Sequence, residues 1–158
     1  MTIEMLDWDS EFFGIKIGRL FIKDESGFDP LNFKRQARDE KYELVYVLKF
    51  DEMLPWNMAL NAELELTDIQ LTMSRKFVAN DYKNFPYDFR TKLTSKEKDA
   101  CYKIAEEISV VSRFYKEEKI GRDKTVAMYR KWIDNTLNRT FCDGLFLIKE
   151  ANEILGIH

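Results

Sequence analysis

The order of three patterns in the first third of the chain constrains the fold more than any other feature. Asp29 and Pro30 are typical of a helix start, with Asp as the N-cap and Pro at the first helical position, and the predicted helix ends near Glu40. The run 43–48, Glu-Leu-Val-Tyr-Val-Leu, is almost entirely apolar, which favours a strand covered on both faces. Alternating apolar residues predict another strand from about 13 to 23. Strand, helix and strand together predict a right-handed crossover unit.

A bulge, an ambiguous segment and one more strand complete the first half. The apolar alternation changes parity near Gly18, which predicts a β-bulge there. Residues 52–64 fit either a short helix or a packed loop. Residues 68–77 alternate between apolar and polar side chains, as a half-buried strand does. A polar stretch with a proline follows, so we expect an N-terminal α/β lobe over residues 1–84 and a second lobe over residues 85–158.

The second half predicts a short strand and two amphipathic helices. The strand is expected from Tyr87 to Leu93, and the capping box Thr94-Ser95-Lys96-Glu97 then starts a helix of about four turns. The apolar stripe of this helix comprises Ala100, Cys101, Ile104, Ala105, Ile108 and Val111. A charged loop ends in Gly121, and Asp123 is expected to cap the second helix. Its inward-facing residues are expected to be Val126, Met128, Tyr129, Trp132, Ile133 and Leu137.

A β-hairpin is predicted at the end of the sequence. Leu145–Ile148 is an apolar run expected to form a buried strand, and residues 154–157 are expected to pair with it after a turn at 151–153. The second half therefore has the element order β-α-α-β-β. The fold class predicted from pattern alone is α/β or α+β, in two lobes.

Composition and charge exclude several classes of function. The chain has 25 Lys and Arg against 28 Asp and Glu, a net charge of -3, so no basic excess indicates a nucleic-acid or anionic-membrane partner. No segment approaches the roughly 20 apolar residues of a membrane span. The only histidine is His158, so we expect neither a histidine-based catalytic site nor a metal site. Cys101 and Cys142 form no CxxC pair and are interpreted as buried thiols in a cytoplasmic protein.

Two segments carry a resemblance to a known family. Residues 6–14 read L-D-W-D-S-E-F-F-G, and residues 112–141 contain S-R-F, then W-I-x-N, then T-F. The first segment is similar to the W-[DE]-x-x-F-F-G opening of the TDP-fucosamine acetyltransferases and related nucleotide-sugar N-acetyltransferases. The second is similar to the S-R-F … W-I-x-N … G-T-F segment of the same enzymes, which belong to the GNAT superfamily of N-acyltransferases.

The resemblance implies both a fold and an activity. The chain would comprise the N-terminal lobe and the first half of a truncated GNAT lobe. The implied reaction moves an acetyl group from acetyl-CoA to the 4-amino group of a TDP-linked 4-amino-4,6-dideoxy sugar. The attacking amine must be neutral, an acid (commonly a tyrosine) protonates the CoA thiolate, and a backbone N–H polarises the thioester oxygen.

The same resemblance identifies what these 158 residues do not contain. The family holds the CoA pyrophosphate with a [QR]-x-x-G-x-[GA] motif at a helix start, after the fourth strand. The six glycines of this sequence include no GxG pair. We therefore expect the chain as given neither to bind acetyl-CoA well nor to supply a catalytic residue.

Four residues are candidates for binding the acceptor, by resemblance. They are Ser112, Arg113, Phe114 and Tyr129, and Arg113 would pair with a phosphate of the nucleotide. The alternative for Ser112-Arg113-Phe114 is a helix C-terminal cap with the phenyl ring in the core. The alternative for Tyr129 is core packing together with Trp132.

A second class of function stays open. The chain could be a non-catalytic binding or oligomerisation module derived from the acyltransferase fold. In either case residues 154–157 form an apolar strand with one neighbour missing. We expect a homo-oligomer in which this edge, or the face of the helix at 123–139, is covered by another chain.

Overall fold

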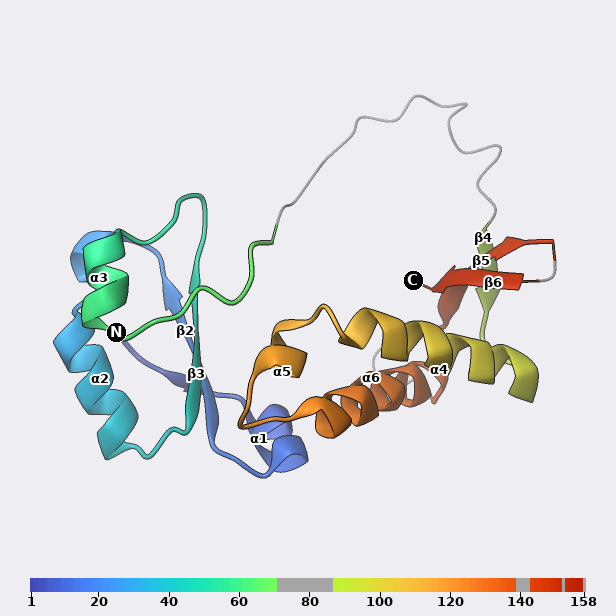
Figure 1. Cartoon of the computed structure of the whole chain (residues 1–158), viewed down its shortest axis with the longest axis horizontal. Coiled ribbons are helices and arrows are strands. Elements are labelled where there is room, and N and C mark those ends of the chain that lie inside the picture. Colours follow the sequence, from blue (N-terminus) through green and yellow to red (C-terminus); the bar gives the residue numbers. More distant parts are fainter. Residues whose placement is uncertain (71–86, 139–142, 152, 158) are drawn as a thin grey trace. The chain divides into compact units, whose positions relative to one another are not determined.

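The computed structural model describes residues 1–70, 87–138, 143–151 and 153–157, which form a mixed α/β structure with two three-stranded sheets (Figure 1). The α+β fold class is therefore confirmed. Two compact units, Met1–Thr67 and Asp68–His158, each contain one sheet. The predicted lobe boundary at 84/85 and most of the strand predicted at 68–77 lie outside the described residues.

The first unit is built on a sheet of order β1-β2-β3. Strand β1 (Glu4–Met5) pairs antiparallel with β2 (Ile17–Ile22), and β2 pairs parallel with β3 (Leu44–Lys49). Helix α2 (Pro30–Asp39) lies between the two parallel strands in the sequence, so the predicted strand–helix–strand unit is confirmed.

The predicted helix start is also confirmed. Asp29 is the N-cap of α2, and its Oδ1 accepts hydrogen bonds from the backbone N–H groups of Leu31 (2.9 Å) and Asn32 (3.2 Å). The ambiguous segment 52–64 contains a short helix, α3 (Trp56–Asn61). A 3₁₀ turn, η1 (Glu25–Gly27), precedes α2.

Two predictions for β2 are wrong. The strand does not begin at 13, because residues Asp7–Phe13 form helix α1, which ends at Gly14 with a φ of 72°. Gly18 is not a bulge, since pairing with β3 is continuous along β2. A Cβ at Gly18 would lie 2.5 Å from Ile3 Cγ2 and 2.8 Å from Tyr42 Cε1. Glycine is present there because two side chains approach the backbone closely.

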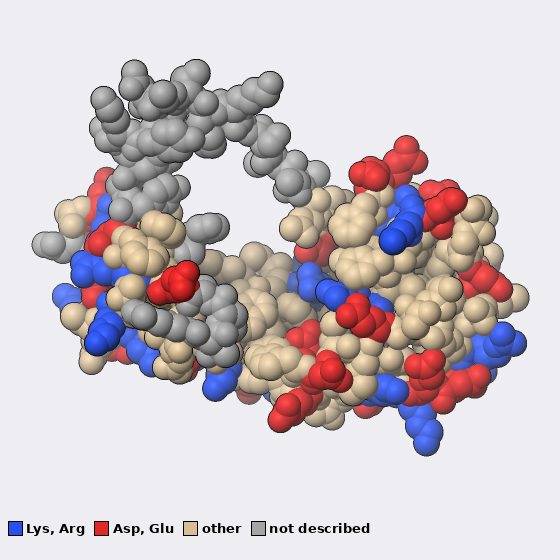
Figure 2. Space-filling view, turned by 180° about the vertical axis from the view of Figure 1, so that it is seen from behind, with Lys and Arg blue, Asp and Glu red and all other residues tan. Residues whose placement is uncertain are grey.

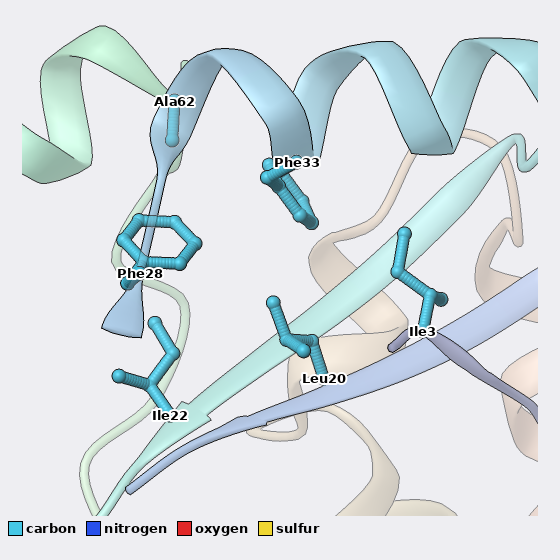
Figure 3. Packing of buried hydrophobic residues seen from close by; sticks show 6 residues of the cluster. All are labelled: Ile3, Leu20, Ile22, Phe28, Phe33 and Ala62. Carbon is cyan, nitrogen blue, oxygen red and sulfur yellow. The ribbon is translucent and has the colours of Figure 1, made fainter. Parts of the chain in front are cut away.

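The core of the first unit lies between one face of its sheet and helices α2 and α3 (Figure 3). Figure 3 shows strand residues pointing toward side chains from the helical layer. The buried cluster comprises Ile3, Leu20, Ile22, Phe28, Phe33 and Ala62. The expectation that β3 is covered on both faces is wrong, because each of its residues stays partly exposed. In the described sheet β3 is an edge strand, and Val45 and Val47 on one of its faces pack against the buried cluster.

The second unit has the order strand, three helices, strand, strand. Its elements are β4 (Tyr87–Arg90), α4 (Ser95–Ser109), α5 (Arg113–Lys116), α6 (Arg122–Leu137), β5 (Leu145–Glu150) and β6 (Glu153–Ile157). Both strand pairs, β4–β5 and β5–β6, are antiparallel. The predicted β-α-α-β-β order and the hairpin are confirmed, and the short helix α5 is an addition. Helices α4 and α6 lie side by side (Figure 1).

The N-terminus of α4 follows the prediction, and that of α6 does not. Thr94 and Glu97 form the capping box: Thr94 Oγ1 accepts from Glu97 N at 3.3 Å, and a Glu97 carboxylate oxygen accepts from Thr94 N at 3.0 Å. Asp123 does not cap α6. The N-cap is Gly121, without a side-chain cap, at a φ of 80° that favours glycine.

The core of the second unit lies where α4, α6 and β5 meet. Its buried residues are Cys101, Ala105, Ile133, Leu145 and Leu147. The predicted stripe of α4 is wrong at its end, since Ile108 is 46% and Val111 75% exposed, whereas Ser109 is fully buried. Strand β5 alternates instead of being buried throughout, because Phe146 is 40% exposed.

Candidate functional site

Ser112 stands at the junction between α4 and α5. Its hydroxyl donates to the carbonyl oxygen of Ser109 at 2.8 Å and accepts from the backbone N–H of Tyr115 at 3.3 Å. Ser112 is thus the N-cap of α5. Both hydrogen bonds are local and fix the direction in which the chain leaves α4 and enters α5.

Arg113 is the first residue of α5, and its side chain is 39% exposed. The guanidinium carbon lies 4.6 Å from the centre of the Phe114 ring. Nη1 lies 3.9 Å from Asp68 Oδ2, a long ion pair within the second unit. One face of the guanidinium is therefore against an aromatic ring, while part of the side chain reaches solvent.

Phe114 is buried, with 7% of its surface exposed, as the packing alternative expected. Its ring meets Trp132 of α6 edge to face, with centroids 6.4 Å apart and an interplanar angle of 80°. Trp132 in turn lies against Tyr129, with centroids 4.9 Å apart. The structure thus connects three of the predicted binding residues, Arg113, Phe114 and Tyr129, through Trp132. Ser112 adjoins them as the helix cap.

A second guanidinium, that of Arg122, lies near α5. Arg122, the first residue of α6, has its guanidinium carbon 5.2 Å from the centre of the Tyr115 ring. Arg113 and Arg122 therefore each contact an aromatic ring of α5.

The pattern reasoning missed an ion network where β4, β5 and the start of α4 meet. Lys149 Nζ lies 2.9 Å from Glu97 Oε1 and 3.0 Å from Asp88 Oδ2, and Arg90 Nη2 lies 2.8 Å from Asp88 Oδ2. The hydrogen bond from the Thr94 backbone and the one from Lys149 lower the pKa of Glu97 to about 2. Only the capping role of Glu97 was visible in the sequence.

A second polar cluster joins α4 to α6. The Tyr102 hydroxyl donates to Asp134 Oδ1 at 2.6 Å, and Lys98 Nζ lies 2.7 Å from the same oxygen. Burial acts to raise the pKa of Asp134, but hydrogen bonds from Lys98 and Tyr102 outweigh it, and the pKa lies below its ordinary value. Each charge in this cluster has an opposite charge nearby, which is typical of a structural interhelical contact.

Cys101 lies in the core, as predicted. It is fully buried, and burial raises the pKa of its thiol to about 11. A thiol with so high a pKa is a poor nucleophile at neutral pH. Cys142 lies outside the described residues.

Neither long helix of the second unit begins in a way that suits the pyrophosphate of acetyl-CoA. Helix α4 follows a strand, as a pyrophosphate-binding helix would, but its first turn already holds the Glu97 carboxylate. Helix α6 begins at a glycine, yet it follows α5 and not a strand. Across the described part of the chain, no group of three or more His, Cys, Asp or Glu could hold a metal ion.

The surface charge is mixed. Figure 2 shows Lys and Arg side chains interspersed with Asp and Glu over the described residues of one face. No helix within the described ranges is long and apolar enough to cross a membrane. No family model matches the chain, and no curated protein matches it.

Proposed function

We propose that this chain supplies the acceptor-binding side of a GNAT-type N-acyltransferase. That enzyme would move an acetyl group from acetyl-CoA to the amine of a nucleotide-linked amino sugar. The observation that carries the proposal is the position of Arg113. It lies on a short helix between the two long helices of a β-α-α-β-β unit, with its guanidinium held on Phe114 and partly open to solvent.

In this proposal Arg113 binds the diphosphate of the nucleotide. A guanidinium presents parallel N–H groups that match two oxygens of a phosphate, and such charge-assisted pairs are stronger than neutral hydrogen bonds. Ser112 would contribute indirectly, because both of its hydrogen bonds are used to start α5. Phe114 and Tyr129 would support the site from the core side.

Acetyl-CoA would supply the acyl group, and residues other than the described ones would bind it. Neither α4 nor α6 begins as a pyrophosphate-binding helix would, so no catalytic step is assigned to this chain. Its own contribution is to bind and orient the acceptor.

Separate calorimetric titrations with thymidine diphosphate (TDP) and with acetyl-CoA test this division of roles. We expect saturable heat with TDP and none with acetyl-CoA. Binding of acetyl-CoA to these 158 residues without TDP binding would contradict the proposal.

A second candidate is a non-catalytic module that assembles through its sheet. Strand β6 pairs only with β5 among the described strands, and Leu155 on it is 52% exposed. An apolar strand at a sheet edge is a template for pairing with another chain. A protein that forms stable oligomers through β6 and binds neither TDP nor acetyl-CoA would favour the module.

A further inference from the structure

We infer that Trp132 is a positioning residue for Arg113. The rings of Tyr129, Trp132 and Phe114, here called the aromatic series, would set the plane of the guanidinium so that its outer edge meets a phosphate. This inference rests on the proposed function and deepens it. It adds Trp132, which the sequence pattern assigned to core packing and not to the site.

The rings of the aromatic series contact one another in turn. Tyr129 and Trp132 are three residues apart on α6, so their side chains lie on the same face of the helix. Their ring centroids are 4.9 Å apart, and the Trp132 and Phe114 centroids are 6.4 Å apart at an angle of 80°. Both distances fall within the range of favourable aromatic pairs, so each ring restricts the next.

The aromatic series acts on Arg113 through Phe114. Phe114 belongs to a helix of four residues, and its ring is buried. Trp132, from the long helix α6, contacts this ring edge to face and so helps to fix its orientation. The guanidinium carbon of Arg113 lies 4.6 Å from the centre of that ring, so the ring restricts where the guanidinium can move. A long, flexible arginine side chain loses conformational entropy on binding, and restraint before binding lowers that cost.

Asp68 lies near the Arg113 guanidinium, with its Oδ2 at 3.9 Å from Nη1. This distance is too long for a direct hydrogen bond, and both side chains are more than a third exposed. Such a pair contributes little stability, so a diphosphate with two negative charges would displace it. The guanidinium edge toward Asp68 is thus the edge we assign to the ligand.

The test compares Trp132→Leu with Trp132→Phe, and a thermal melt establishes that each variant is folded. The leucine variant keeps an apolar side chain but removes the ring, whereas the phenylalanine variant keeps an aromatic contact. We expect Trp132→Leu to weaken TDP binding about tenfold and Trp132→Phe to stay within about threefold of the original protein. Phe114→Leu provides a second variant if Trp132→Leu does not fold.

A readout without ligand separates positioning from general loss of structure. The NMR resonance of Arg113 Hε should carry a ring-current shift from Phe114. We expect this shift to diminish in Trp132→Leu and to persist in Trp132→Phe, while Tyr102→Phe, an aromatic change between α4 and α6, should leave it unchanged.

The outcomes distinguish the two proposals. A parent protein that binds no TDP contradicts the proposed function. If the parent protein binds TDP and Arg113→Ala abolishes binding, but Trp132→Leu preserves both affinity and the Hε shift, the inference alone is overturned.

Discussion

Lys149 on β5 lies 2.9 Å from Glu97 in the first turn of α4, although the two residues are 52 positions apart in the sequence. The same ammonium lies 3.0 Å from Asp88 on β4. Glu97 therefore serves two purposes: it completes the capping box of α4 and ties that helix to both strands of the neighbouring pair.

Replacing Glu97 with Gln should remove the ion pair and keep the cap, because Gln also serves in a capping box. The pKa of Glu97 is about 2 in the folded protein against an ordinary value of 4.5. Its carboxylate thus stabilises the fold fully above about pH 4.5, and this stabilisation is lost as the pH falls toward 2.

We expect Glu97→Gln to lower the free energy of unfolding by about 1 kcal/mol at pH 7 and to approach the original protein near pH 2. Denaturant titrations across this pH range measure the difference. Glu107→Gln, at an exposed position of the same helix, is the matched control and should have no such effect. A pH-independent difference would show that the lost stability does not come from the charge.

Gly18→Ala should destabilise the first unit by about 1–3 kcal/mol, because the added methyl group overlaps Ile3 and Tyr42. Gly27→Ala is the control, since nothing lies within 4 Å of a Cβ at that position. Thermal unfolding of both variants measures the difference in stability. Equal melting temperatures for the two would show that Ile3 and Tyr42 move aside freely.

Local patterns predicted the parts of the fold that depend on a few neighbouring residues. Two helix starts were predicted, from Asp29 with Pro30 and from Thr94 with Glu97. Both were predictable because the capping partners lie within three positions of each other. The hairpin of β5 and β6 was equally readable from an apolar run and a turn.

Features that depend on distant residues were missed or misread. The parity change near Gly18 was misread as a bulge, whereas Gly18 lies in a continuous strand where Ile3 and Tyr42 approach the backbone. No local pattern contains that contact. Ser109 is buried in place of the apolar Ile108, since burial follows how α4 packs and not polarity alone.

The sequence predicted only the part of the candidate site that depends on neighbouring residues. The segment S-R-F identified Arg113 and Phe114, and the structure places them in contact. Phe114 and Trp132 are eighteen positions apart in the sequence, and their contact depends on how α5 packs against α6. It therefore could not be inferred from spacing.

Asp68→Asn should increase affinity for TDP by about two- to fivefold, because it removes a carboxylate that competes for Arg113. Calorimetric titration measures the change. Asp99→Asn alters the net charge equally at an exposed position of α4 and serves as the control. Equal gains in both variants would assign the effect to net charge and would count against competition at Arg113.

Leu155→Lys should weaken self-association about tenfold or more if β6 pairs with another chain, because a lysine on an edge strand opposes strand pairing. Sedimentation velocity over a concentration series measures the change. Val111→Lys is the control at another exposed apolar position of the second unit. A protein that stays monomeric at every concentration, before any substitution, would contradict the predicted homo-oligomer.

The most direct measurement of the central claim is the affinity for TDP of Arg113→Ala beside that of Arg122→Ala. Each substitution removes one positive charge, in both cases a guanidinium that lies over a ring of α5. The account predicts a loss of about tenfold or more for Arg113→Ala and less than about threefold for Arg122→Ala. Equal losses, or no loss at Arg113, would contradict the assignment of the phosphate to this side chain.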